Sequence, residues 1–130
     1  MKTFEFNYSV RLDDLDYMSI VGNANWLIFM ERARIELLQK IDFPFQKMLK
    51  RKIGGVVSES NVKYLRPARF GDVLKIIITP AIESDVSTIL EYDIQNSSGK
   101  SFVKANLKMV FVDETGKPTF IPEEIKARIS

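Results

Sequence analysis

One helical segment, preceded by an acidic loop, constrains the fold of this chain most. Apolar residues recur there at three- and four-residue steps, as one face of a helix requires: Trp26, Leu27, Met30, Ala33, Leu37, Leu38 and Ile41. From Trp26 to Met30 every residue is apolar, and a helix that is hydrophobic all round is expected to be surrounded by protein. We therefore expect a long helix, capped by Asn23 or Asn25, whose N-terminal end is enclosed.

Alternating apolar and polar residues predict five strands around this helix. The clearest alternation covers residues 4–12, and further strands are expected over 56–65, 73–79, 88–95 and 103–111. Short helices are expected over 45–52, ended by Gly54 and Gly55, and over 122–129. Hairpins between the last four strands imply an antiparallel sheet. The expected fold class is therefore α+β, a five-stranded antiparallel sheet curled around one long helix, as a single domain over residues 1–130.

Composition narrows the chemistry of the chain. It contains no cysteine and no histidine, which removes thiol nucleophiles, the usual general base and the usual metal ligands. Carboxylates, hydroxyls, Lys, Arg and backbone dipoles remain. The formal net charge of +2 comes from 19 basic and 17 acidic residues, and no basic face suggests a nucleic-acid partner. No segment resembles a signal peptide or a membrane span, so we expect a cytoplasmic protein.

The acidic loop offers a carboxylate close to the start of the long helix. A helix N-terminus presents free N–H groups that can polarise a carbonyl, and an acid beside it, Asp16, can act as nucleophile or general base. The alternative is that Asp13, Asp14 and Asp16 only complement the helix dipole and keep the loop soluble. Spacing alone leaves both interpretations open.

Two segments resemble the 4-hydroxybenzoyl-CoA thioesterase family, which has the hotdog fold. The first is Asp14-Leu-Asp16-Tyr-Met-Ser19-Ile20-Val21-Gly-Asn23-Ala24-Asn-Trp26 followed by Ala33-Arg34-Ile35-Glu36, and the second is Tyr64-Leu-Arg66-Pro67-Ala68-Arg69-Phe-Gly71-Asp72. The resemblance implies that Asp16 attacks a thioester or activates water, and that the amide of Asn23 or a neighbour polarises the carbonyl. It also implies a site between two subunits and no metal or cofactor. The chain departs from the family at Ser19, usually glycine, and at Ile20, often histidine.

Further candidate residues follow from these segments. Glu59 is a possible second catalytic carboxylate, expected mid-strand with Val57, Asn61 and Lys63 on one side and facing the helix N-terminus; the alternative is an outward residue paired with a lysine. Arg66 and Arg69 are candidates for phosphate binding or are plain turn residues. The remaining substrate-binding candidates are Ser19, Val21 and Trp26, the last of which could equally be core.

The sequence thus predicts hydrolysis of an acyl-CoA thioester by a homodimer or homotetramer, with no membrane partner. Oligomerisation is expected because five strands on one helix leave sheet edges and one sheet face uncovered. Two alternatives stay open: a thioesterase acting on acyl carrier protein, and a non-catalytic acyl-CoA-binding module. A hotdog dehydratase is disfavoured because those enzymes usually rely on a histidine.

Overall fold

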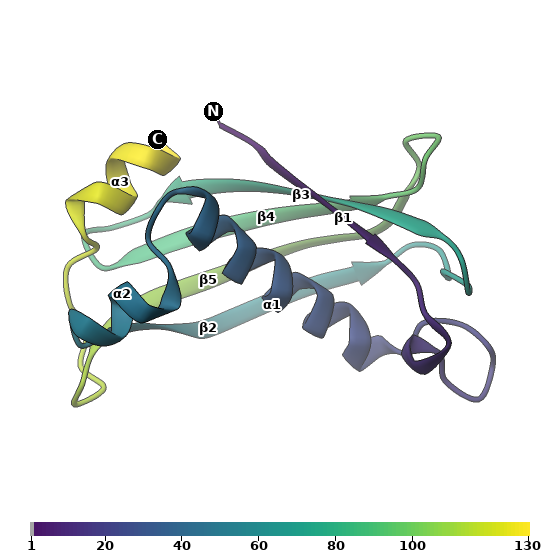
Figure 1. The fold of residues 1–130 in the computed structure, drawn as a ribbon, viewed down its shortest axis with the longest axis horizontal. Coiled ribbons are helices and arrows are strands. Elements are labelled where there is room, and N and C mark those ends of the chain that lie inside the picture. The colour runs from purple at the N-terminus through teal and green to yellow at the C-terminus, as the bar shows by residue number, and fades with distance from the viewer. Residues whose placement is uncertain (1) are drawn as a thin grey trace.

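The computed structural model describes residues 2–130; Met1, the first residue of the predicted domain, lies outside the described residues. A five-stranded antiparallel sheet curls around one long helix (Figure 1). The strands are β1 (Phe4–Ser9), β2 (Ile53–Tyr64), β3 (Val73–Ile82), β4 (Ser87–Gln95) and β5 (Ser101–Asp113). The helices are α1 (Asn23–Lys40), α2 (Phe45–Lys50) and α3 (Glu123–Ile129), with a 3-10 turn, η1 (Leu12–Asp14), after β1. The expected fold class is confirmed.

The order of strands in the sheet is β1-β3-β4-β5-β2, so β1 and β2 form its two edges. The expectation that hairpins join all four later strands is wrong for the step from β2 to β3. Strand β2 pairs with β5, whereas β3 pairs with β1 and β4. Residues 65–72 therefore cross one end of the sheet instead of making a hairpin, and they carry a fully buried residue, Ala68, into the core.

Helix α1 buries one face against the concave side of the sheet. Its buried residues are Trp26, Phe29, Met30, Ala33 and Leu37. They pack in one core with inward residues of the middle strands, which include Leu74, Ile76, Ile78, Val103 and Leu107. Leu27 and Ile28, in contrast, are each 43% exposed. The expected enclosure of the first two turns on all sides is thus wrong for a single chain, because the outward face of this end has no cover.

Strand β2 differs from the sequence expectation in two ways. Gly54 and Gly55 lie inside β2 and do not end α2, which already finishes at Lys50. A β-bulge separates Val57, which pairs with Met109, from Glu59, which pairs with Lys108. The extra residue reverses the alternation of side chains. Val57 therefore faces the same side as Met109, and Glu59 faces the opposite side, so the two do not share a face.

Within residues 2–130, no helix combines the length and the apolar character needed to cross a membrane.

Candidate active site

The loop before α1 is a tight hairpin that fixes the position of Asp16. Leu15 and Val21 form an isolated β-bridge. Between them the amide of Asp16 donates to the carbonyl of Ile20 (2.8 Å), and the amide of Ser19 donates to the carbonyl of Asp16 (3.0 Å). Ser19 has φ of +61°, the left-handed region that glycine adopts most readily. Ser19 therefore adopts the same left-handed backbone conformation that a glycine at this position could adopt.

The three acids of the loop have different environments. Asp14 is only 5% exposed, and its Oδ2 accepts hydrogen bonds from the Tyr8 hydroxyl (2.8 Å) and the Arg11 amide (2.8 Å). Asp13 is exposed and lies 3.3 Å from the Arg11 guanidinium. Asp14 therefore holds the turn together, a structural role that the sequence pattern did not separate from those of its neighbours.

Asp16 is the acid that lies beside the start of α1. Its Cβ is 3.7 Å from the position that a Cβ on Gly22, the N-cap residue, would occupy. The amide of Asn25 donates to the Gly22 carbonyl (3.0 Å), but the amides of Asn23 and Ala24 have no acceptor among residues 2–130. Asp16 is exposed, and its Oδ1 accepts from the Met18 amide (2.8 Å). A carboxylate and two free helix amides thus share one end of α1.

The crossing segment 65–72 lies against this hairpin. The amide of Val21 donates to the carbonyl of Ala68 (2.9 Å), which places Arg66 and Arg69 at the same end of the molecule as Asp16. Both arginines are exposed, and within the part of the chain that the structure describes neither guanidinium has an ion-pair partner. Val21 itself is buried in the core.

Trp26 also lies in the core. It is 2% exposed, and its ring packs edge-on against Phe29, with centroids 5.7 Å apart, and against Phe102 at 5.9 Å. The core interpretation of Trp26 therefore describes its surroundings in this chain. The predicted roles of Trp26 and Val21 in substrate binding stay predictions.

This chain is similar in sequence to one protein family and to several of its members. Residues 10–129 match the family described as the thioesterase-like superfamily. The chain belongs to this superfamily. The acyl-CoA thioester hydrolase YbgC of Escherichia coli O6:H1 is 31% identical over 130 residues, 98% of this chain and 97% of its own length. The acyl-CoA thioesterase YbgC of Haemophilus influenzae is 32% identical over 126 residues, 95% of this chain and 92% of its own length.

Solved structures of other proteins share the fold. A 1,4-dihydroxy-2-naphthoyl-CoA thioesterase from Synechocystis superposes with a TM-score of 0.92 at 20% identity, covering 98% of this chain and 96% of that one. A Staphylococcus aureus protein solved in complex with CoA has a TM-score of 0.91 at 15% identity, covering 98% of this chain and 82% of that one. At these identities the likeness shows the fold alone. The resemblance to hotdog-fold thioesterases found in the sequence is confirmed.

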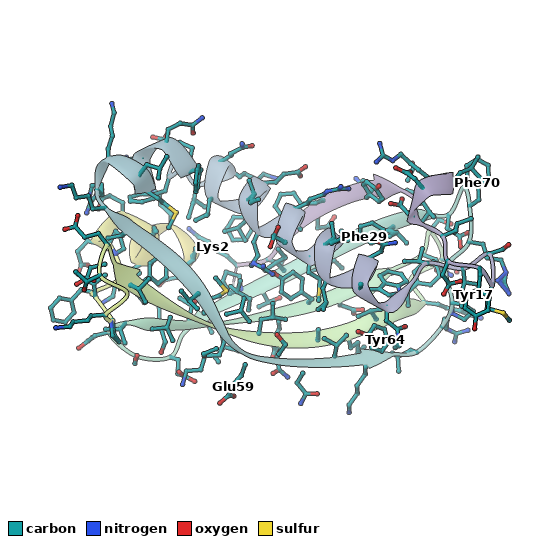
Figure 2. All side chains as sticks on the ribbon, turned by 90° about the horizontal axis from the view of Figure 1, so that it is seen from below. Lys2, Tyr17, Phe29, Glu59, Tyr64 and Phe70 are labelled. Atoms are coloured by element: carbon teal, nitrogen blue, oxygen red, sulfur yellow. The ribbon has the colours of Figure 1, made fainter. Side chains whose placement is uncertain are left out.

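In this member of the thioesterase-like superfamily, Glu59 does not lie beside Asp16. It projects from the sheet face away from α1 (Figure 2). The pKa of its neighbour Lys108 is raised mainly by hydrogen bonding to Glu83, with Nζ and Oε1 3.0 Å apart, and to a smaller extent by the charge of Glu59. The expected orientation of Glu59 toward the helix N-terminus is wrong within one chain. The bulge after Val57 shifts the alternation of side chains in β2, so Glu59 projects from the face opposite to that of Val57. A catalytic role for Glu59 stays a prediction.

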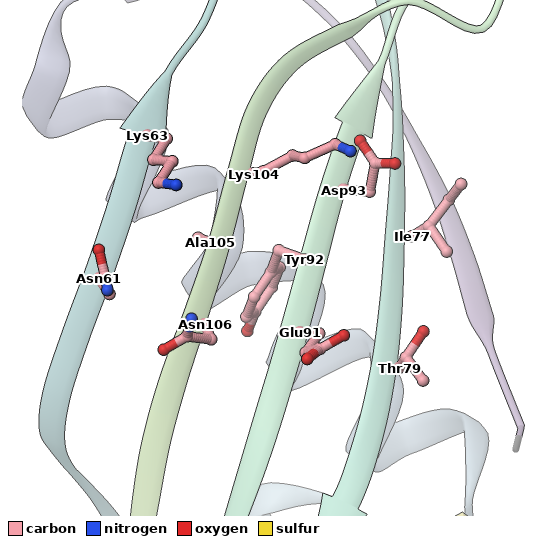
Figure 3. A pocket seen from close by; sticks show the side chains of 10 residues that line it. All are labelled: Asn61, Lys63, Ile77, Thr79, Glu91, Tyr92, Asp93, Lys104, Ala105 and Asn106. Carbon is pink, nitrogen blue, oxygen red and sulfur yellow. The ribbon is translucent and has the colours of Figure 1, made fainter.

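The sheet face that carries Glu59 is polar. Figure 3 shows Lys63, Lys104, Glu91 and Asp93 projecting from it, with the helices behind the sheet. They surround a concavity of about 480 Å³. Asp93 is held by the side chains of Gln95 (2.9 Å) and Ser101 (2.6 Å). This cavity is on the sheet face away from α1, whereas Asp16 lies in the loop just before α1.

Several apolar side chains are exposed on the Asp16 loop and on the crossing segment beside it, and we call them the apolar rim: Leu12, Tyr17, Met18 and Phe70. All four are well exposed, Tyr17 at 94%, and Figure 2 shows Tyr17 and Phe70 at the same end of the molecule. Exposed apolar groups gathered in one place are typical of a surface that another molecule covers. The sequence analysis missed this rim, although Tyr17 and Met18 stand out as apolar residues in an acidic loop.

Proposed function

We propose that this chain hydrolyses acyl-CoA thioesters to the free acid and CoA. The observation that carries the proposal is the carboxylate of Asp16 beside the free amides of Asn23 and Ala24. The names of two relatives that match nearly the full chain, an acyl-CoA thioester hydrolase and an acyl-CoA thioesterase, support the substrate class.

The chemistry follows from what these groups can do. The thioester oxygen would accept hydrogen bonds from the Asn23 and Ala24 amides, which stabilise the negative charge that develops on it. Asp16 then acts in one of two ways. As a nucleophile it attacks the carbonyl carbon, the C–S bond breaks, CoA leaves as thiolate, and water hydrolyses the resulting anhydride. As a general base it takes a proton from a water that attacks the same carbon; the tetrahedral intermediate then breaks its C–S bond, and CoA leaves as thiolate.

We propose further that the active unit contains two copies of the chain. All of β2 beyond Gly54 is exposed apart from the half-buried Val62, and one edge of this 12-residue strand has no partner among the described residues. Long unpaired edges invite pairing with another chain. In Figure 1, α1 begins near the end of β2. A twofold axis through β2 would pair two such edges antiparallel and bring the α1 N-terminus of one copy to the start of β2 in the other.

Arg66 and Arg69 suit the phosphates of CoA. Both guanidinium groups are exposed, and the bond between Val21 and Ala68 holds their segment against the Asp16 loop. The same two charges could contact an acidic carrier protein, so a thioesterase acting on acyl carrier protein is the alternative. Rates on one acyl group attached to CoA and to acyl carrier protein distinguish the two, and our proposal expects the higher kcat/KM with CoA.

The test of the proposal is the variant Asp16→Asn beside its matched control Asp13→Asn. Both replace a carboxylate of the same exposed loop, but only Asp16 lies beside the helix amides. We expect Asp16→Asn to lower kcat for acyl-CoA hydrolysis by at least about 10²-fold, as loss of a positioned acid or base does, and Asp13→Asn to keep the wild-type rate. Equal activity of the two variants would contradict the assignment. Binding of acyl-CoA by wild type without turnover would support the non-catalytic module instead.

A further inference from the structure

A second cavity, on the α1 side of the sheet, is almost entirely apolar. It lies between the C-terminal half of α1, the helix α2 and the start of β2, and α3, the end of β3, the start of β4 and the end of β5 complete its lining. Its volume is about 600 Å³, within the range of small-molecule sites. We call it the α1–β2 groove. Aliphatic and aromatic side chains form its walls, among them Ile35, Leu38, Phe45, Met48, Met109 and Phe111.

Among residues 2–130, only three polar side chains line the groove. Glu31 and Arg34 lie on α1 before its apolar lining residues, which begin at Ile35, and Thr88 is buried on β4. The Arg34 guanidinium already donates to the Tyr92 hydroxyl (3.3 Å) and lies 3.9 Å from Glu31. A ring that carried hydroxyl or carboxyl groups would bury them mostly against carbon, which costs free energy that no hydrogen bond returns. An alkyl chain would bury only apolar surface, which is favourable.

The floor of the groove is formed where a side chain is missing. A Cβ on Gly55 would lie 2.9 Å from Cε of Met109, so the methionine occupies the space above this glycine. Methionine is unbranched and adapts its shape readily. Gly54 also borders the groove, but only with its backbone. Its cross-strand partner Val112 alternates with the inward-facing Phe111, so a side chain at Gly54 would project from the opposite face of the sheet, where a Cβ meets nothing within 4 Å. Gly55 and Met109 therefore set the depth of the groove, and Gly54 does not.

The groove does not reach Asp16 of the same chain. Asp16 lies before the first residue of α1, whereas the second half of α1 lines the groove. A helix of 18 residues is about 27 Å long, so Asp16 and the groove are at opposite ends of α1. The twofold pairing of β2 edges proposed above would place the Asp16 of one copy near the start of β2 in the other. The start of β2, Ile53 to Val57, is the part of the strand that lines the groove.

We infer that the α1–β2 groove of one copy takes the hydrocarbon chain of a thioester whose carbonyl lies at Asp16 of the other copy, so that the substrates are aliphatic acyl thioesters of medium to long chain. The inference rests on the proposed acyl-CoA hydrolysis. A cavity of this size is far larger than a short acyl group fills, and its lining offers a hydroxylated aromatic ring few partners. Gly55 and Met109 are its specificity-determining residues.

The first experiment compares kcat/KM of the wild type for butyryl-CoA, dodecanoyl-CoA and 4-hydroxybenzoyl-CoA. Each methylene buried in the groove should raise kcat/KM about fourfold until the groove is filled, so dodecanoyl-CoA should exceed butyryl-CoA by more than about a hundredfold. The aromatic thioester should be at least about tenfold slower than dodecanoyl-CoA. Activity that favours butyryl-CoA or 4-hydroxybenzoyl-CoA overturns the inference but leaves the proposed function standing. A wild type that hydrolyses none of the three overturns both.

The second experiment uses the two glycines as a matched pair. Gly55→Val drives Met109 into the groove and should lower kcat/KM for dodecanoyl-CoA by about tenfold or more, with less than about a twofold change for butyryl-CoA. Gly54→Val adds the same side chain to the same strand and should leave the ratio unchanged. Gly55→Ala is measured as well, because its Cβ alone already displaces Met109. If Gly55→Val does not fold, the alanine variant should show the same selective loss on dodecanoyl-CoA and tests the assignment in its place. Equal losses on both substrates would overturn the assignment of the floor.

The third experiment tests the arrangement across two copies. Asp16→Asn and Gly55→Val chains are co-expressed with different affinity tags, and the mixed species carrying both tags is purified. It has one site with an intact Asp16 and an intact groove, so its activity on dodecanoyl-CoA should rise severalfold above that of either variant alone. No rise would show that Asp16 and the groove act within one chain or not together, and would overturn the inference.

Discussion

At the scale of single residues, the loop before α1 divides its carboxylates between structure and chemistry. Asp14 is buried with two hydrogen bonds, while Asp16 is exposed beside free amides. The sequence placed all three acids before the helix but could not assign their roles. Their roles depend on which way each side chain points out of a tight hairpin, and that is set by contacts with Tyr8 and Gly22, residues outside the acidic run.

Replacing Asp14 should therefore affect stability. Asp14→Ala leaves the Tyr8 hydroxyl and the Arg11 amide without their acceptor, and we expect a loss of about 1–3 kcal/mol in the free energy of unfolding. Asp13→Ala, at an exposed ion pair, should change it by less than about 0.5 kcal/mol. Urea unfolding of both variants checks this, and equal effects would show that Asp14 does not hold the turn.

Ser19 stands where the family that the sequence resembles usually has glycine, and its backbone conformation is the relevant feature. The sequence could identify Ser19 in place of glycine but could not tell whether the loop would keep its shape. The positive φ of Ser19 shows that serine adopts the left-handed conformation, at a cost on the order of 1 kcal/mol that the hydrogen bonds of the hairpin must offset.

At the scale of secondary-structure elements, alternation predicted where strands lie but not how they pair. The expected ranges for the later strands agree closely with β2 to β5. In β3, β4 and β5 the alternation arises because one face packs on the core, whereas β2 contains no buried residue. The pairing of β2 with β5 depends on the crossing of residues 65–72, which leaves no local signal. The bulge after Val57 also has no recognisable sequence signal. Because of it, Glu59 projects from the sheet face opposite to that of Val57.

Tyr92 ties α1 to the sheet and gives a prediction for alkaline pH. Its hydroxyl on β4 donates to the Met30 carbonyl of α1 (3.3 Å), and burial raises the pKa of Tyr92 from 10.0 to about 12, partly opposed by the charge of Arg34. Since the folded pKa is the higher one, this tyrosine contributes stability below pH 10.0 that is lost as the pH rises toward 12.

Tyr92→Phe should therefore lower stability near neutral pH by about 1 kcal/mol and flatten the fall in stability above pH 10.0. The control is Tyr17→Phe, at a tyrosine that is almost fully exposed, which should leave the alkaline profile of the wild type unchanged. Urea midpoints measured from neutral to strongly alkaline pH provide the comparison. An equally steep alkaline fall in Tyr92→Phe would contradict the role given to this hydroxyl.

At the scale of the whole molecule, one chain leaves apolar surface uncovered on α1, on β2 and at the apolar rim. The sequence indicated that edges and faces would need cover, and it marked Leu27 and Ile28 as enclosed. The single chain does not enclose them, and the two-copy unit that we propose would supply a cover. The α1–β2 groove was beyond the sequence, because it depends on packing among three helices and the bulged edge strand.

We expect light scattering on purified protein to give twice the 15.0 kDa of one chain, or four times that mass for a tetramer. Leu27→Glu, a change on an exposed helix face, should shift the mass toward that of one chain if the face is covered by a partner. A wild type that stays at 15.0 kDa across protein concentrations would contradict the two-copy site.

The central claim is that Asp16 performs the chemistry at a thioester held by the rest of the site. The most direct measurement mixes the Asp16→Asn protein with dodecanoyl-CoA and follows, by mass spectrometry over time, both the bound thioester and the released acid. We predict binding with an affinity close to that of the wild type, an unchanged melting temperature, and intact thioester long after the wild type has released its acid. Release of dodecanoic acid by the variant at the wild-type rate would contradict the account.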